Sequence, residues 1–148
     1  PTELFDEDGQ EMGRVGSEFG ATTGRPRRCG WFDAVVGRYS AMVNGVDFWA
    51  MTKLDVLDGF ETLKICVAYE CDGKRYDNMP ASTRVLEKCT PIYEEMPGWM
   101  SRTDNVTAYD DLPEKAKAYV QRLCELTNTK LGILSVGPKR ASTLRIAL

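Results

Sequence analysis

Three arginines lie within a glycine-rich stretch of twelve residues, GATTGRPRRCGW, at positions 20–31. Glycine permits positive φ angles, and successive backbone N–H groups in such turns form concavities that bind anions. The guanidinium of arginine adds a planar fork of donors that matches a carboxylate or a phosphate. Because Arg25, Arg27 and Arg28 fall within four positions, the stretch favours a small anionic ligand over a long polyanion. A basic turn that contacts only solvent is the alternative that these residues leave open.

A second group that suits ligand chemistry is TKLD at positions 52–55, where an apolar run ends. The carboxylate of Asp55 can accept from both N1–H and N2–H2 of guanine, a pair of donors that adenine lacks. The methylene stem of Lys53 can lie along the plane of a base while its ammonium stays in water. A solvated lysine and aspartate at the end of a strand are the alternative.

A third stretch, SVGPKR at positions 135–140, also follows an apolar run. The hydroxyl of Ser135 and the backbone around Gly137 can approach the other side of a purine, because ligands of open α/β sheets bind where strands end. Two such turns suited to one base, together with an anion-binding loop, are a more specific combination than any one of them.

Two helices are predicted from apolar residues at helical spacing. The first covers 35–43 and stops at Asn44 and Gly45, which are typical of a helix end. The second begins at Pro113, a residue favoured in the first turn, and continues to Asn128. The apolar face of the second helix consists of Ala116, Tyr119, Val120 and Leu123.

Strands are predicted where apolar residues form short runs or alternate with polar residues. They fall within 46–55, over 62–69 and over 131–136. Asp72 and Gly73 predict a hairpin turn after the second strand. Strands that alternate with helices in this way indicate a layered α/β fold with mixed strand directions.

Two parts of the chain show no clear hydrophobic period. Residues 1–19 are acidic and interrupted by glycines, so we expect loop or short extended pieces there. Pro91 and Pro97 interrupt residues 81–99, which favours irregular structure or short strands around PIYEEMPGW.

The composition argues against several classes of function. A net charge of −3 and a pI of about 5.1 give no reason to expect nucleic acid or a membrane as partner. No apolar run approaches the roughly 18–20 residues of a membrane helix, so we expect a soluble, cytoplasmic protein. Five cysteines without a C-x-x-C pair, in a chain without histidine, favour reduced thiols over a metal site. The lack of histidine also removes the usual general base near neutral pH.

Five stretches, in this order and spacing, resemble the C-terminal part of the adenylosuccinate synthetase family. They are residues 17–31, TKLDVLDG at 52–59, CVAY at 66–69, PIYEEMPGW at 91–99 and SVGPKR at 135–140. The resemblance covers essentially the whole chain and implies part of a mixed-sheet enzyme that is similar to P-loop NTPases. It implies a cytoplasmic homodimer that couples IMP to L-aspartate in the first committed step from IMP to AMP, with GTP as co-substrate and Mg²⁺ as cofactor.

The resemblance also implies a role for each of the three stretches. Arg25 would reach both aspartate and the IMP ribose, and Arg27 would reach aspartate and the phosphate region of GTP. The loop that closes over aspartate would consist of Ala21, Thr22, Thr23, Gly24, Arg25, Pro26 and Arg27. The guanine pocket would consist of Lys53, Leu54, Asp55, Ser135, Val136 and Gly137.

The sequence departs from the family pattern in minor and major respects. Pro26 stands where some members have arginine or lysine, and Val136 stands where some have threonine. We expect the loop to tolerate Pro26, because both arginines with assigned roles remain. The family's phosphate loop, catalytic aspartate and histidine, and magnesium ligands lie upstream and have no counterpart here. We therefore expect about the last third of a synthetase, inactive alone, with an acidic segment and arginine loop at 1–31 and an α/β region with guanine-binding turns at 32–148.

Two other interpretations stay open. A non-catalytic domain would use the same loop to bind a nucleotide or an anion, and the absence of a G-x-x-x-x-G-K-[ST] loop favours it for the chain taken alone. A protein-interaction module would use the surface around PIYEEMPGW at 91–99, although aromatic and methionine side chains more often lie in a core.

Overall fold

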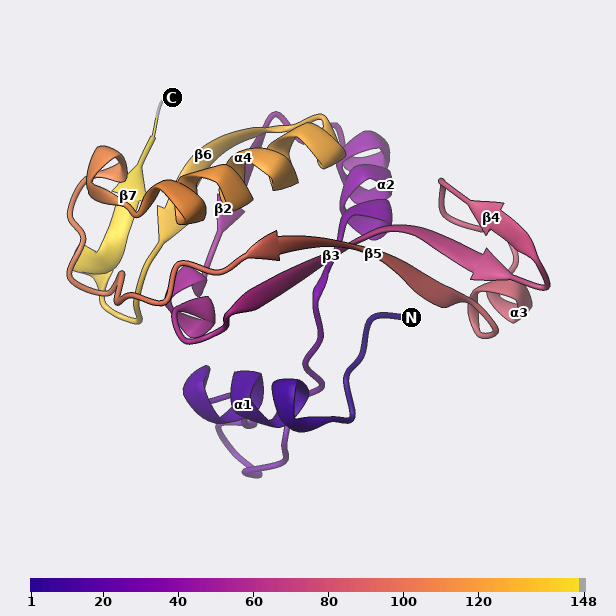
Figure 1. Ribbon diagram of the computed structural model, residues 1–148, viewed down its shortest axis with the longest axis horizontal. Coiled ribbons are helices and arrows are strands. Elements are labelled where there is room, and N and C mark those ends of the chain that lie inside the picture. The colour runs from indigo at the N-terminus through magenta and orange to yellow at the C-terminus, as the bar shows by residue number, and fades with distance from the viewer. Residues whose placement is uncertain (147–148) are drawn as a thin grey trace.

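Two mixed sheets and four helices make up residues 1–146, the part of the chain that the computed structural model describes (Figure 1). This arrangement confirms the expected α/β fold with mixed strand directions. The last two residues of the predicted region 32–148 lie outside the described part. The helices are α1 (Glu7–Val15), α2 (Ala34–Asn44), α3 (Thr83–Leu86) and α4 (Glu114–Thr127). Short 3₁₀ turns are η1 (Leu54–Leu57), η2 (Tyr109–Asp111) and η3 (Arg140–Ser142).

The first sheet is organised around a long antiparallel pair of strands. Its members are β1 (Phe32–Asp33), β3 (Thr62–Cys71), β4 (Lys74–Tyr76) and β5 (Thr90–Pro97). The predicted hairpin turn joins β3 to β4, and β1 runs parallel to β3. Of the two expectations for 81–99, a strand is the correct one for β5, which pairs with β3 from Pro97 to Thr90. Pro91 and Pro97 are tolerated because β5 is an edge strand within residues 1–146.

The second sheet joins the two strands that precede the predicted guanine-binding turns. It contains β2 (Phe48–Met51), β6 (Lys130–Ser135) and β7 (Thr143–Arg145). β2 and β6 run parallel, and β7 runs antiparallel to β6. The predicted strands in 46–55 and 131–136 are therefore confirmed, and both end at the same edge of this sheet.

The two predicted helices are confirmed, with ends that follow from their capping residues. Asp33 caps α2, because its carboxylate accepts from the N–H groups of Val35 and Val36, each over 3.0 Å. Gly45 ends α2 in the left-handed region, at φ +60°. Asn128 ends α4 in the same region, at φ +51°.

The expectation of loop or short extended pieces at 1–19 was wrong for α1. Asp6 caps this helix by accepting from the N–H of Gly9 over 3.1 Å, and Glu7 and Asp8 favour the positive end of the helix dipole. Met12 is the one large apolar side chain of α1 that lies in the core. The sequence of this helix therefore shows no apolar stripe. In Figure 1, α1 lies on the opposite side of the β3–β5 pair from α4.

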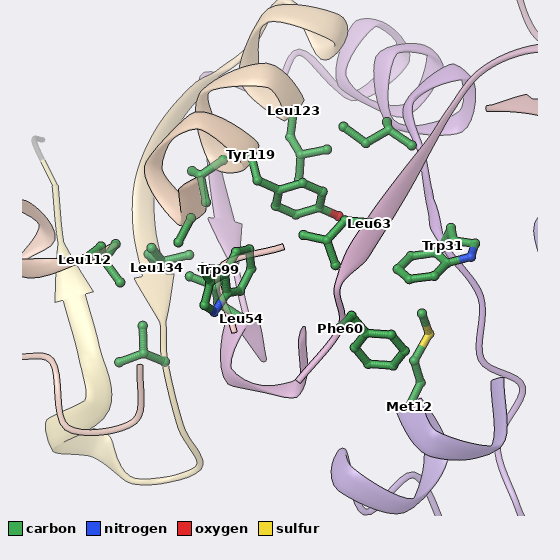
Figure 2. Packing of buried hydrophobic residues seen from close by; sticks show 14 of the residues in the cluster. Met12, Trp31, Leu54, Phe60, Leu63, Trp99, Leu112, Tyr119, Leu123 and Leu134 are labelled. Carbon is green, nitrogen blue, oxygen red and sulfur yellow. The ribbon is translucent and has the colours of Figure 1, made fainter. Parts of the chain in front are cut away.

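One apolar core connects α1, both sheets and α4 (Figure 2). Tyr119 and Leu123 of α4 face Leu63 of β3 and Leu134 of β6, and Leu54 of η1 packs into the same cluster. Burial of such side chains contributes about 1.5–3 kcal/mol each. The core therefore holds the residues next to the predicted guanine-binding turns.

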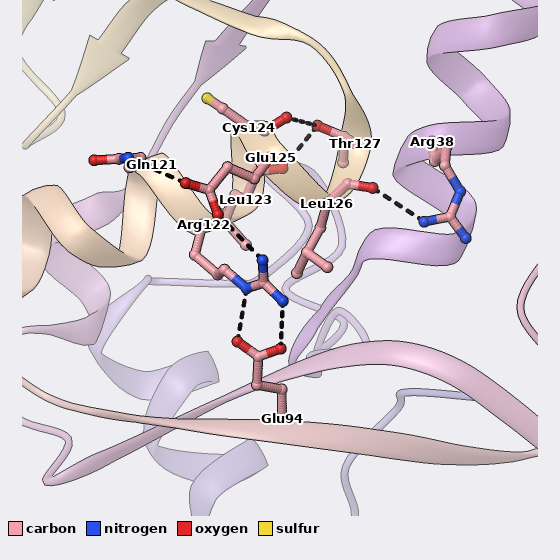
Figure 3. Close-up of polar contacts among 9 residues, drawn as sticks. All are labelled: Arg38, Glu94, Gln121, Arg122, Leu123, Cys124, Glu125, Leu126 and Thr127. Carbon is pink, nitrogen blue, oxygen red and sulfur yellow. Dashed lines mark hydrogen bonds and ion pairs between the residues drawn. The ribbon is translucent and has the colours of Figure 1, made fainter.

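Polar contacts between α4 and neighbouring elements help to fix the orientation of this helix (Figure 3). The guanidinium of Arg122 on α4 donates twice to the carboxylate of Glu94 on β5, over 2.7 and 2.8 Å. Arg38 of α2 donates to the carbonyl of Leu126 at the end of α4, over 3.0 Å. A planar fork of this kind fixes an angle as well as a distance, so α4 has a set orientation on the first sheet.

Candidate functional site

The arginine loop, residues 20–31, begins as a hairpin with an exposed tip. The N–H of Gly20 donates to the carbonyl of Arg25, and the N–H of Gly24 donates to the carbonyl of Gly20, each over 2.8 Å. Gly24 has φ +66°, where a side chain would be strained. Every residue from 21 to 28 is exposed, so the tip is open to a ligand along its length.

The far end of the loop is fixed to the core. Trp31 is buried and meets the ring of Phe60 edge-on, with 5.5 Å between the ring centroids. Gly30 pairs with Glu3, and a Cβ at Gly30 would collide with the carbonyl oxygen of Thr2. The exposed tip is therefore held at a defined place on the body of the protein.

Pro26 removes no hydrogen bond from this hairpin. The closing bonds use the carbonyl of Arg25 on one side and the N–H of Arg27 on the other, which donates to the carbonyl of Glu18 over 2.9 Å. The missing N–H of Pro26 has no role in either bond, which agrees with the expected tolerance of this residue.

The three arginines of the loop differ in their partners. Arg27 donates to Glu18 over 3.3 Å, and Arg28 donates to Glu3 over 2.7 Å. Arg25 has no ion-pair partner among residues 1–146, which leaves its guanidinium available to an anion. Exposed pairs such as Arg28 and Glu3 contribute little stability and exchange readily for a ligand.

The turn after β2 places Lys53, Leu54 and Asp55 in three different environments. Lys53 is exposed and adopts φ +63°, which is unusual for a residue with a side chain. Leu54 is buried in the core and begins η1. Asp55 is half-buried, and its Oδ1 atom is enclosed without a hydrogen-bond partner among the described residues.

The environment of Asp55 disfavours its charge. Burial raises the pKa of Asp55, and the nearby charges of Asp58 and Asp104 raise it further, against the lowering effects of its own backbone N–H and Lys53. A buried acceptor without a partner is costly. A ligand that brings N–H donors to Oδ1 would therefore gain from this site.

The turn after β6 lies beside the turn after β2, because Leu134 pairs with Met51. Ser135 donates its hydroxyl to the carbonyl of Gly137 over 2.9 Å. The N–H of Val136 donates to the carbonyl of Ser142 over 2.9 Å, and the Val136 side chain is fully buried. This turn thus presents backbone and hydroxyl groups at the edge where Asp55 lies.

Residues 100–104, which lie outside the stretches quoted above, contact the turn after β2 through Asp58. Asp58 accepts from the indole N–H of Trp99 over 2.7 Å, and from the N–H and hydroxyl of Thr103 over 2.7 and 2.9 Å. A Cβ built at Gly137 would lie 3.9 Å from the Cβ of Asp104. The one sequence feature that could have indicated this contact was Asp58 itself, a second aspartate three residues after Asp55.

Glu18 is a second residue that sequence reasoning missed, and it joins the arginine loop to the turn after β2. Its carboxylate accepts from Arg27 over 3.3 Å and also from the ammonium of Lys53. Lys53 donates in addition to the carbonyl of Gly16 over 2.9 Å. Contact with Lys53, and then with Arg27, lowers the pKa of Glu18 against the effect of partial burial.

A cleft of about 570 Å³ lies between the loop, β2 and α4. Its charged groups come from Glu18, Arg27, Arg28 and Lys53, and Trp49 is among the residues that contribute apolar surface. Of the residues with predicted roles, only Arg27, Lys53 and Leu54 line it. The cleft is not lined by Arg25, by Asp55 or by the turn after β6.

Comparison with known proteins decides the family. The family model described as adenylosuccinate synthetase matches residues 1–144. The chain belongs to this family. Among curated members, the adenylosuccinate synthetases of Geobacter sulfurreducens and Geobacter metallireducens are each 54% identical to the chain, over 147 and 146 residues. The alignments cover 99% of the chain and 34% of each relative, so the chain spans about a third of their length.

A solved member of the adenylosuccinate synthetase family has the same fold in this region. The structure described as fully ligated adenylosuccinate synthetase from Plasmodium falciparum superposes with a TM-score of 0.92 at 34% identity. The match covers 99% of the chain and 35% of that protein. The two sheets and their helices are therefore those of an adenylosuccinate synthetase.

Two kinds of structure are absent from residues 1–146. None of the helices in residues 1–146 has the length and apolar character required to cross a bilayer. The same residues bring together no group of three or more histidine, cysteine, aspartate or glutamate side chains that suits a metal ion.

Proposed function

We propose that the chain supplies the aspartate-binding loop and the guanine pocket of an adenylosuccinate synthetase. The whole enzyme makes adenylosuccinate from IMP and L-aspartate. In that reaction the γ-phosphoryl group of GTP passes to the purine 6-oxygen of IMP, the amine of aspartate attacks C6, and phosphate leaves, so that GDP and phosphate are the other products. Membership of the family and the names of the relatives support this activity.

The enclosed Oδ1 of Asp55, which lacks a partner among the described residues, is the observation that carries the guanine assignment. Guanine brings two adjacent N–H donors that one carboxylate can accept. The turn with Ser135, Val136 and Gly137 lies at the same sheet edge and would contact the other side of the base. Leu54 would contribute the buried support of the pocket, since it anchors η1 in the core.

The arginine loop suits a dicarboxylate substrate. In this proposal, Ala21 to Arg27 close over aspartate, Arg25 reaches aspartate and the IMP ribose, and Arg27 reaches aspartate and the phosphates of GTP. The exposed tip supports these roles, as does the guanidinium of Arg25, which has no ion-pair partner among residues 1–146. Holding aspartate in one orientation brings its amine toward the purine, an effect that lowers a barrier without any new acid or base.

Groups from outside residues 1–148 would complete the enzyme. The proposal places the phosphate loop, the catalytic aspartate and histidine, and the ligands of Mg²⁺ there, so the chain alone is expected to be inactive. Magnesium would neutralise phosphate charge on GTP when bound. We also propose that the intact protein is a cytoplasmic homodimer, as the resemblance implies.

Exchange of the nucleotide tests the guanine assignment. In the full-length protein that carries this chain, Asp55→Asn should lose activity with GTP and gain activity with XTP, because xanthine has an acceptor where guanine has an amino donor. Steady-state rates with both nucleotides, at fixed IMP and aspartate, give the measurement. Asp47→Asn, at an exposed site away from the turns, is the matched control. Unchanged GTP kinetics in Asp55→Asn would remove this residue from the site.

A further inference from the structure

Glu18 lies between two elements to which the proposed function gives different substrates. One oxygen of its carboxylate accepts from Arg27 of the arginine loop, and the other accepts from Lys53 in the turn after β2. Only 22% of the Glu18 side chain is exposed, against 59% for Arg27 and 48% for Lys53. Glu18 therefore has the least exposed side chain of the three.

The backbone of Glu18 is held on both sides. Its N–H donates to the carbonyl of Gly13 in α1 over 2.8 Å, and its carbonyl accepts from the N–H of Arg27 over 2.9 Å. The carboxylate thus starts from a fixed point between α1 and the hairpin. A side chain with this support can hold other groups in place.

The side chain of Lys53 is held at its end as well as through its backbone. Its ammonium donates to Glu18 and to the carbonyl of Gly16, so the residues before the hairpin hold the end of its side chain. The backbone of Lys53 is in the left-handed region, at φ +63°. With both ends held, the methylene stem has fewer conformations open to it and can still contact a base plane.

We propose that Glu18 is a positioning residue that couples the arginine loop to the turn at 52–55, an inference that rests on the proposed function. Glu18 acts through Lys53 and Arg27 and contacts neither aspartate nor nucleotide. When an anionic ligand draws Arg27 away, the Glu18 carboxylate interacts with Lys53 alone and holds its stem more firmly for the base. Nucleotide that fixes Lys53 has the reciprocal effect on the loop, because a coupling between two binding equilibria is symmetric.

The test measures this coupling in the full-length protein that carries the chain. Aspartate is titrated at saturating and at subsaturating GTP, and the ratio of the two aspartate KM values reports the coupling. We expect the wild-type protein to bind aspartate more tightly at saturating GTP. In Glu18→Ala that ratio should fall to one. The KM for aspartate and the KM for GTP should each rise about two- to fivefold, the range that partly exposed ion pairs give. The value of kcat should change less than about twofold, since no reacting group is lost.

Two further variants separate positioning from general stability. Glu18→Gln keeps one neutral acceptor for Lys53, so it should recover most of the GTP KM but not the coupling ratio. Glu11→Ala removes the exposed pair between Glu11 and Arg14 on α1, and it should leave both quantities unchanged. If Glu18→Ala does not fold, Glu18→Gln alone carries the test.

Failure of this inference differs from failure of the proposed function. A wild-type protein that consumes GTP with IMP and aspartate, but shows the same coupling ratio before and after loss of Glu18, would overturn the coupling alone. The same holds if the wild-type ratio is already one. A wild-type protein that does not consume GTP under these conditions would overturn the proposed function and the inference with it.

Discussion

Met51 in β2 lies opposite Leu134 in the parallel strand β6. The pairing brings TKLD and SVGPKR, which are far apart in sequence, to one edge of the second sheet. Ligands of open α/β sheets bind at such carboxyl edges, because the loops that follow parallel strands gather there. The strand register, and not either motif by itself, therefore creates a possible base-binding site.

Loss of the loop arginines should weaken the use of aspartate. We expect Arg25→Leu and Arg27→Leu each to raise the aspartate KM about tenfold or more, because a hydrogen bond to a charged group contributes about 1.5–3 kcal/mol. Aspartate titration at saturating IMP and GTP gives the value. Arg75→Leu is the matched control, since Arg75 lies on β4 away from the loop and pairs with Asp77. Wild-type KM and kcat in the first two variants would contradict the loop assignment.

A methyl group at Gly137 should disturb the turn after β6. A Cβ there would lie 3.0 Å from the hydroxyl oxygen of Ser142 and 3.2 Å from its Cβ. We expect Gly137→Ala to raise the GTP KM several-fold and to leave the aspartate KM near its wild-type value. Gly59→Ala is the control, because nothing lies within 4 Å of a Cβ at that position. Equal effects of the two substitutions would count against a role for this turn.

Removal of an acceptor at Asp58 should destabilise the segment beside the site. Asp58→Asn replaces one carboxylate oxygen by an NH2 group, which cannot accept, so the remaining oxygen cannot serve both Trp99 and the backbone N–H of Thr103 as the carboxylate does. We expect a loss of about 1–3 kcal/mol in the free energy of unfolding, the usual cost of an unsatisfied buried group. Urea unfolding followed by tryptophan fluorescence measures it. Asp104→Asn, which weakens an exposed pair with Arg102, should change the free energy of unfolding much less than Asp58→Asn does.

The raised pKa of Asp55 gives stability a pH dependence of known sign. Because the folded state favours the protonated form, the Asp55 contribution to stability is greatest at low pH and is lost as the pH rises through its raised pKa. Asp55→Asn should therefore be more stable than the wild type at pH 7. The difference should shrink as the pH falls toward the ordinary aspartate pKa of about 3.9. Thermal unfolding of both proteins across this range decides the matter, and a gap that widens toward acid would refute it.

The cysteines should react in two classes with a thiol reagent at neutral pH. Burial raises the pKa of Cys66 to about 12 and also raises the pKa of Cys29, Cys71 and Cys124, so exposure to the reagent separates the two classes. Cys66, Cys71 and Cys89 are buried, whereas Cys29 and Cys124 are half-buried. We expect the two half-buried thiols to react first and all five to react after denaturation. Fast native-state reaction of Cys66 would show that β3 opens more easily than its packing indicates.

The sequence predicted the elements that carry a strong local pattern. α4 has a clear apolar face and an asparagine at its end, and β3 is followed by an aspartate–glycine turn. α1 escaped prediction because one core residue, Met12, gives no period. β5 was predicted only in part, because its prolines are compatible with a strand only at the edge of a sheet. Whether a strand lies at an edge depends on its neighbours and cannot be read from the segment itself.

The residues of the candidate site also include some that a local sequence pattern reveals and some that it does not. The arginine loop and TKLD carry unusual residue types and can be found by inspection, although their proposed ligands come from the family resemblance. Glu18 and Asp58 are common residue types whose importance depends on partners distant in sequence, Lys53 and Thr103. Such contacts depend on tertiary packing, which a local pattern does not encode.

The pairing of β2 with β6 also has a consequence for synthesis on the ribosome. The arginine loop closes through contacts between neighbouring residues, so it can form soon after it emerges. β2 emerges early as well, but its partner within residues 1–146 is made only after the β3–β5 pair and α4. During that interval β2 has no strand to pair with among residues 1–146. The proposed base-binding edge is thus among the last parts of this chain to be assembled.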